Sequence, residues 1–346
     1  MLSFLVLLAV TLGWFLLPII PAILELVRPT DVQPLQVVDR SAGEVDFFAR
    51  NFRQYFEKQI AAHAALPAGE RPRDALPDGT RFIQVRAASD AGTGNEDRLV
   101  VVESQLALPG DETFLVELYA RAPLTGGPRA VYRAIYGERE LTLGEGSRVL
   151  RWAHAAGRFS VGAHSVLQGR ISSDRIVSLG GGVIFERIGA PVIAMGTENE
   201  PPPEPPALAK EFVLPEGACA AGDHFRIEGD LNIPGGVRVN TSLVVGGSVI
   251  VGLGTVVEGS IKAHRDVELA DEARVRGSVV ARRRVMTGAA AWIGGPVIAE
   301  QRIRLGRGTV VGGPNLPATV SAPEVELSQG VTVYGQISAP KGGRTF

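Results

Sequence analysis

Three consecutive blocks of 18 residues decide the fold: GSIKAHRDVELADEARVR from Gly259, GSVVARRRVMTGAAAWIG from Gly277 and GPVIAEQRIRLGRGTVVG from Gly295. Each block begins with glycine, and its third, fifth, ninth, eleventh, fifteenth and seventeenth residues are apolar or threonine. Alternation of this kind is typical of a strand with one buried face, and here the inward pairs recur every six residues. The pattern predicts an all-β solenoid, a three-sided β-helix in which each 18-residue coil holds three short strands.

The same frame covers nine coils between Arg133 and Pro340. With 21% charged residues in the chain, roughly one inward position in five should be charged, and none is. Cys219 falls on an inward position, which predicts a small core residue. The frame assigns these residues to the core: Ile261, Val267, Leu269, Val275, Val279, Val285, Ile293, Val297, Ile303, Leu305 and Val311.

Two irregularities interrupt the frame. The block from Gly247 runs only 12 residues to Gly259, as though one face of the coil were skipped. Residues 196–210, GTENEPPPEPPALAK, leave the frame altogether. Their proline-rich, acidic composition predicts an extended excursion between two runs of coils, either a spacer or a docking peptide for a partner.

The N-terminal segment predicts a membrane anchor. Leu2 to Leu24 contain no charged residue, and about 20 apolar residues span a bilayer core. A cleaved signal peptide is the alternative, but no Lys or Arg precedes the run and no A-x-A-like site follows it. Arginines after the span favour a single-pass protein of the inner (cytoplasmic) membrane, with its large domain in the cytoplasm.

A helix and a small α/β cap region are expected between this anchor and the coils. Phe48, Phe52, Phe56 and Ile60 form a stripe on one face of a predicted amphipathic helix over 43–65. The stripe packs either on the protein's own body or on a membrane surface, and the first option is favoured because acidic residues dilute the basic face. The β-prone runs 81–86, 99–102 and 114–119 do not fit the frame and predict an irregular cap on the first coil.

The expected organisation has six segments: 1–28, transmembrane anchor; 29–132, linker, amphipathic helix and β cap; 133–195, N-terminal coils; 196–210, proline-rich excursion; 211–340, C-terminal coils; 341–346, tail.

Composition excludes several functions. The formal net charge is −2 and the sequence pI is near 6.3, so no basic field steers the protein to nucleic acid. Cys219 is the only cysteine, which excludes an intrachain disulfide and a thiolate metal cluster. No motif for a cofactor or a metal is present, and we expect neither.

The C-terminal coils resemble the bactofilins, a bacterial family of polymer-forming cytoskeletal proteins. The resemblance rests on the repeats GSIKA, GSVVA, GPVIA and GQISA and covers about 211–340. It implies a right-handed β-helix whose subunits join end to end into nonpolar filaments without nucleotide, often at the membrane and often recruiting envelope-synthesis proteins. The predicted cap, the excursion and the anchor depart from that pattern and put polymerisation in doubt. The C-terminal end looks freer, because only 341–346 remain to cover it.

One surface is a candidate ligand site. Arg133, Arg151, Arg170 and Arg187 fall near one corner of successive coils, where they could hold an anionic polysaccharide or a lipid head group. Trp152, with Tyr136 nearby, would supply a stacking surface. A purely structural role is favoured, in which the arginines pair with acidic neighbours, namely Glu138, Glu140, Asp174 and Glu186.

No catalytic residue is assigned. The five histidines, His63, His154, His164, His224 and His264, read as surface imidazoles with no acidic partner in a cleft. Outward charges such as Asp266 beside Arg284 read as surface ladders. The sequence therefore favours a membrane-anchored, bactofilin-like scaffold that self-associates through its β-helix and organises cell-envelope or polysaccharide-synthesis proteins, and not an enzyme. The alternatives are a polysaccharide-binding or polysaccharide-modifying β-helix and a hexapeptide-type acyltransferase.

Overall fold

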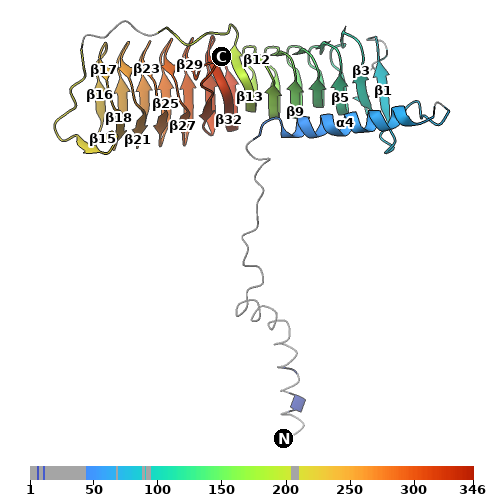
Figure 1. Cartoon of the computed structure of the whole chain (residues 1–346), viewed down its shortest axis with the longest axis horizontal. Coiled ribbons are helices and arrows are strands. Elements are labelled where there is room, and N and C mark those ends of the chain that lie inside the picture. The colour runs from blue at the N-terminus through green and yellow to red at the C-terminus, as the bar shows by residue number, and fades with distance from the viewer. Residues whose placement is uncertain are drawn as a thin grey trace. The chain divides into compact units, whose positions relative to one another are not determined.

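The computed structural model describes residues 6–7, 11, 44–67, 69–87, 90, 95–203 and 210–346. Residues 44–346 form one compact unit, separate from 1–43. This unit is a β-solenoid of about 14 turns with one helix along its side, and almost all of its strand pairs are parallel (Figure 1). The helix is α4 (Phe47–Ala65).

The N-terminal half of the solenoid runs from Phe82 to Met195. Its longer strands, such as β7, β9 and β11, bend around a corner of the coil, and the register shifts by one residue at the bend in several pairs. The strands are β1 (Phe82–Val85), β2 (Asn95–Glu96), β3 (Leu99–Val102), β4 (Leu106–Ala107), β5 (Thr113–Ala120), β6 (Leu124–Thr125), β7 (Val131–Gly137), β8 (Leu141–Leu143), β9 (Arg148–Ala155), β10 (Phe159–Val161), β11 (Val166–Ser173), β12 (Ile176–Leu179) and β13 (Ile184–Met195).

The C-terminal half is more regular, with three short strands in each coil. The strands are β14 (Cys219–Ala221), β15 (His224–Ile227), β16 (Leu231–Ile233), β17 (Arg238–Val239), β18 (Ser242–Val245), β19 (Val249–Val251), β20 (Val256–Val257), β21 (Ile261–Ala263), β22 (Val267–Leu269), β23 (Arg274–Val275), β24 (Val279–Ala281), β25 (Arg284–Thr287), β26 (Trp292–Ile293), β27 (Val297–Ala299), β28 (Arg302–Leu305), β29 (Val310–Val311), β30 (Ala318–Ser321), β31 (Glu324–Leu327) and β32 (Thr332–Thr345).

The core of this half consists of inward aliphatic ladders. In one of them Val249, Val267, Val285, Ile303 and Val325 are register partners on successive coils. Every C-terminal residue that the frame assigned to the core, from Ile261 to Val311, has at most 2% of its surface exposed. Stacking equal side chains about 4.8 Å apart removes their apolar surface from water, which is the main stabilisation of such a fold.

No face is skipped after Gly247. Val249 pairs with Val267 and Val256 pairs with Arg274, so each neighbour lies 18 residues on. The three faces share a six-residue period, so a block can start at any of the three corners without a change in structure. The 12-residue block is therefore a change of corner, and the expectation of a missing face is wrong.

The two halves meet end to end. β13, the last strand of the N-terminal half, pairs antiparallel with β32, the last strand of the C-terminal half, with Ile188 opposite Ile337 and Gly189 opposite Gln336. Figure 1 shows the two strands side by side between the green and the orange-red coils. The expectation that the C-terminal end of the solenoid lies free is therefore wrong, because β13 covers it.

The excursion is held against the C-terminal half where the structure describes it. The backbone amide of Asn199 donates a hydrogen bond to the Thr332 hydroxyl (2.8 Å), and the Tyr334 hydroxyl donates one to the backbone carbonyl of Asn199 (3.3 Å). Further on, the Arg274 guanidinium contacts the Pro203 carbonyl. The chain thus returns along the outside of the C-terminal coils, whose first strands lie far from the junction (Figure 1).

The predicted cap is part of the solenoid. β3 pairs with β1 and β5 in parallel, and β5 continues the ladder into β7. The prediction of a separate small α/β cap region is therefore wrong. These coils escaped the sequence frame because corner residues and bulges shift their spacing between 17 and 18 residues.

No helix in the described part of the chain is long and apolar enough to cross a membrane. The predicted transmembrane helix and the single-pass placement in the inner membrane are not supported and are withdrawn. Except for Val6, Leu7 and Thr11, the segment on which they rested lies outside the described residues.

Cys219 is also placed wrongly by the frame, because it is exposed. It lies in β14, which turns back in a hairpin and pairs antiparallel with β15. In this first stretch the alternation slips by one residue. Val213 is the third residue of the block that starts at Glu211, so the frame predicts an inward position, but it is 85% exposed, whereas Phe212 and Leu214 pack on the core. A slip of one residue moves every side chain of a strand to the opposite face.

Candidate functional site

Helix α4 covers one outer face of the N-terminal coils. Beneath it the outward residues Tyr119, Tyr136, His154 and Ser172 are register partners on successive strands. Phe56, 1% exposed, stacks on Tyr119 with 3.9 Å between ring centroids. Three residues of the predicted stripe, Phe52, Phe56 and Ile60, therefore pack on the protein's own body, whereas Phe48 is exposed. The helix begins at Phe47, four residues later than expected.

The same helix covers part of the predicted arginine face. Trp152 is 8% exposed, and its ring centroid lies 5.3 Å from that of Phe52. Arg170 lies over the Phe48 ring (4.9 Å) and donates a hydrogen bond through Nη1 to the Glu44 carbonyl (3.1 Å). Trp152 and Arg170 are therefore partners of α4, so the stacking surface is not open to a ligand.

The other arginines of that face have different surroundings. Arg133 forms an ion pair with Glu117 (3.9 Å), which is not one of its expected partners, and Arg151 is exposed. Arg187 is the register partner of Arg170. Burial, with a smaller contribution from Arg187, lowers the pKa of Arg170. The five predicted residues thus lie on neighbouring coils but do not form one open anion site.

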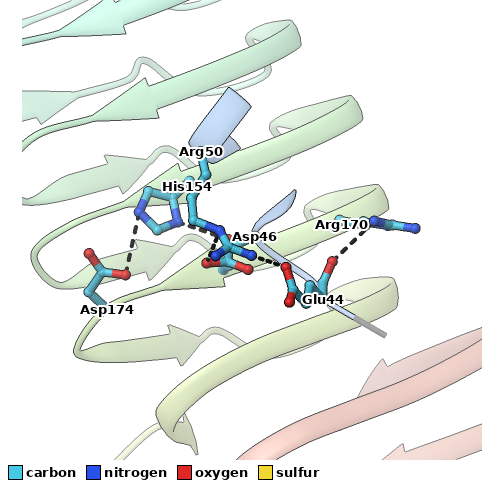
Figure 2. A network of polar contacts seen from close by, with 7 residues as sticks. Glu44, Asp46, Arg50, His154, Arg170 and Asp174 are labelled. Carbon is cyan, nitrogen blue, oxygen red and sulfur yellow. Dashed lines mark hydrogen bonds and ion pairs between the residues drawn. The ribbon is translucent and has the colours of Figure 1, made fainter. Parts of the chain in front are cut away.

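A polar cluster surrounds the N-terminal end of α4, and Figure 2 shows it from close by. His154 Nδ1 lies 2.9 Å from the Ser172 hydroxyl, and His154 Nε2 lies 3.7 Å from Asp174 Oδ1. Just before the helix, Asp46 contacts Arg50 of its first turn (3.0 Å). The imidazole is 3% exposed, and its ring stacks against a tyrosine at 5.2 Å.

The electrostatics of the cluster favour a neutral imidazole. Burial lowers the pKa of His154, and this effect exceeds the opposing attraction of Asp174 and Asp46. Arg50 and Arg53 lower the pKa further. His154 is therefore no surface imidazole, which corrects its predicted placement. The sequence frame places His154 on the outer face of its coil. The side chain is nevertheless buried, because α4 docks on that face.

The cluster contains serine, histidine and aspartate, so its capacity for nucleophilic catalysis must be considered. A triad requires a hydrogen bond from the histidine to both partners and access of a substrate to the serine. The Asp174 carboxylate is too far from the ring for a hydrogen bond, and Ser172 is only 4% exposed. An adjoining cleft of about 220 Å³ is bordered by Ser172 and Gln336. This geometry favours a role in docking the helix.

The remaining histidines do not converge. His63 contacts the Pro72 carbonyl (2.8 Å), and His224 lies 3.2 Å from Asp223. His164 and His264 are exposed. Among the described residues, no group of three or more potential ligands could hold a metal ion.

In the outermost coil of the C-terminal half, β15 is paired with β14 and β17 is paired with Glu211, whereas the outer edge of β16 is open in the described chain. Within the described chain, β16 pairs only with β19. The Leu231 amide donates to the Ser248 carbonyl and the Ile233 carbonyl accepts from Gly252, so both face the neighbouring coil. Because adjacent strand residues point their backbone groups to opposite sides, the N–H and C=O of Asn232 face outward. Such an edge is a template for another strand.

Comparisons with protein-family models, with curated proteins and with solved structures find no match to this chain.

Proposed function

We propose that this protein is a structural scaffold whose β-solenoid joins a second copy through a terminal coil. The rigid faces of the assembled solenoid would then present binding surfaces to proteins that build the cell envelope or its polysaccharides. The bactofilin-like repeats between 211 and 340 support this proposal. A membrane anchor is not part of this proposal.

The observation that carries the proposal is the junction of β13 with β32. It demonstrates within one chain that two coil ends of this cross-section can pair edge to edge. The junction pairs one end of each half of the solenoid, so these two ends are not open to another copy. The outer edge of β16 is the open edge of the C-terminal half, and we infer that it accepts a second copy.

The test is negative-stain electron microscopy of the full chain without nucleotide, over a range of protein concentrations. The expected result is end-to-end particles or filaments. An Asn232→Pro variant removes the outward amide donor of β16 but leaves the inward ladder intact, so it should abolish assembly.

An Asn232→Ser variant is the matched control, because it changes the side chain and keeps the backbone donor. It should assemble like the wild type, and circular dichroism should show that both variants retain the solenoid. Monodisperse single particles of the wild type at every concentration would refute the proposal, as would undiminished assembly of folded Asn232→Pro.

A further inference from the structure

A charged groove follows the outer face of the C-terminal half up to the junction. Two outward ladders form its walls. The first contains Arg284, Arg302, Glu324 and Gly342 as register partners, and the second contains Glu326, the register partner of Arg304. The second ladder ends at Arg344, which lies opposite Ile184 of β13. The groove therefore lies where the two halves of the molecule meet.

Two cations in this groove make no side-chain hydrogen bond and no close ion pair with any described residue. Arg302 donates to Glu324 through Nε (2.9 Å), and Arg304 lies 3.8 Å from Glu326. Lys341 and Arg344 are exposed, and neither makes a side-chain hydrogen bond or an ion pair within the described chain. Arg302, and to a lesser extent Lys341 and Arg344, lower the pKa of Glu324. These cations thus produce a positive field at a place that can accept another anion.

The groove has a floor that leaves room for a ligand. Gly342 is the register partner of Glu324 on the next coil, and a Cβ atom added there would have no neighbouring atom within 4 Å. The cleft around it measures about 290 Å³. A second cleft of about 360 Å³ adjoins it and shares Arg302, Glu324 and Lys341 as lining residues. Together they extend over successive coils along the solenoid axis.

We propose that this groove binds a linear glycan that carries carboxylate groups. Lys341 and Arg344 would pair with the carboxylates, which charge-assisted hydrogen bonds recognise well. Sugar hydroxyls both donate and accept, and Glu324, Glu300 and Gln301 supply acceptors beside the cations. Successive coils lie about 4.8 Å apart, so an extended polymer along the groove passes charged side chains of several coils in turn.

The lining chemistry disfavours nucleic acid as the occupant. Single strands bind on aromatic platforms, and none of the described residues that line the two clefts is aromatic. The carboxylates of Glu324 and Glu326 repel phosphate and carboxylate groups alike, but sugar hydroxyl groups can donate hydrogen bonds to them.

The test is isothermal titration calorimetry of the full chain with a size-defined oligogalacturonate. Its methyl ester serves as the uncharged control, and inorganic phosphate serves as a simple anion. The double variant Lys341→Gln/Arg344→Gln removes the two unpaired cations. Lys262→Gln/Arg139→Gln removes the same charge from exposed positions outside both clefts and is the matched control.

We expect the oligogalacturonate to bind and its methyl ester to bind at least about tenfold more weakly. The groove variant should lose at least about tenfold in affinity, and the control variant should bind like the wild type. The proposal is overturned if the wild type does not bind the oligomer, if both variants lose affinity equally, or if inorganic phosphate binds as tightly as the oligomer. Assembly seen by microscopy does not enter these outcomes, so this proposal and the proposed function stand or fall separately.

Discussion

The two halves of the solenoid share one inward pattern and differ in what lies outside it. In the N-terminal half, outward Tyr119 and Tyr136 are buried beneath α4. In the C-terminal half, the outward positions carry exposed charges such as Arg302 and Glu324. The comparison teaches that the inward ladder fixes the fold, whereas the outward residues decide whether a face becomes a second core or a surface for binding.

The largest effect is expected where α4 forms that second core. Phe56→Ala removes a ring that is 1% exposed and stacks on Tyr119, and should destabilise the protein by about 3–5 kcal/mol. Phe48→Ala, on the same helix but 47% exposed, should cost about 1 kcal/mol or less through its contact with Arg170. Denaturant unfolding followed by circular dichroism measures both. Equal effects would contradict the docking of the helix.

A comparable test applies to the inward ladder of the C-terminal half. Ile303 is fully buried between Val285 and Val325, so Ile303→Ala should cost about 2–5 kcal/mol. Ile298, in the strand just before it, is 42% exposed, and Ile298→Ala should cost clearly less. If Ile298→Ala were as destabilising as Ile303→Ala in thermal unfolding, the assignment of inward and outward faces would be wrong.

The helix-covered face should also respond to acid. Burial lowers the pKa of His154 in the folded state, so the unfolded state binds the proton more tightly. The stability contributed by the neutral ring is complete above the ordinary pKa of 6.5 and is lost as the pH falls below it, towards the lowered folded-state pKa. His154→Gln should flatten the dependence of the melting temperature on pH between about 7 and 5. His264→Gln, which replaces an exposed histidine in the C-terminal half, is the matched control.

The smallest effects belong to the charge ladders. Asp266 accepts two hydrogen bonds from Arg284 (2.9 and 3.2 Å), and this pairing lowers the pKa of Asp266. Asp266→Asn should lower the melting temperature less than Ile303→Ala does, and the difference from the wild type should vanish as the pH falls through that lowered pKa. Asp111→Asn in the N-terminal half breaks the exposed pair with Arg129 and should have no measurable effect. A greater loss in Asp111→Asn would contradict this ranking.

The sequence predicts the inward ladders well because their signal is local. Ile261 and Val267 are identified by a period that needs no knowledge of distant parts of the chain. Cys219 is misplaced because a slip of one residue inverts a strand. The strands β1, β3 and β5 are predicted as β-prone runs, but their coils fall outside the frame because bulges alter the coil length. These errors arise where local geometry departs from the repeat.

Long-range contacts are the part that the sequence cannot supply. Nothing local indicates that β13 meets β32 or that the chain reverses its direction along the axis. The phenylalanine stripe predicts a packed helix, but not that His154 lies beneath it. The open edge at Asn232 and the groove at Gly342 likewise depend on how the coils are stacked.

The most direct test of the central claim, the end-to-end junction within one chain, is a disulfide across it. Ile184 and Arg344 are antiparallel register partners, and both are exposed. Their Cα atoms should lie at the spacing that a disulfide bridges. We would place cysteines at these positions in a Cys219→Ser background, oxidise at low protein concentration and analyse the product by non-reducing electrophoresis and mass spectrometry. The structure predicts a rapid intramolecular cross-link, whereas purely intermolecular products or none would contradict the junction.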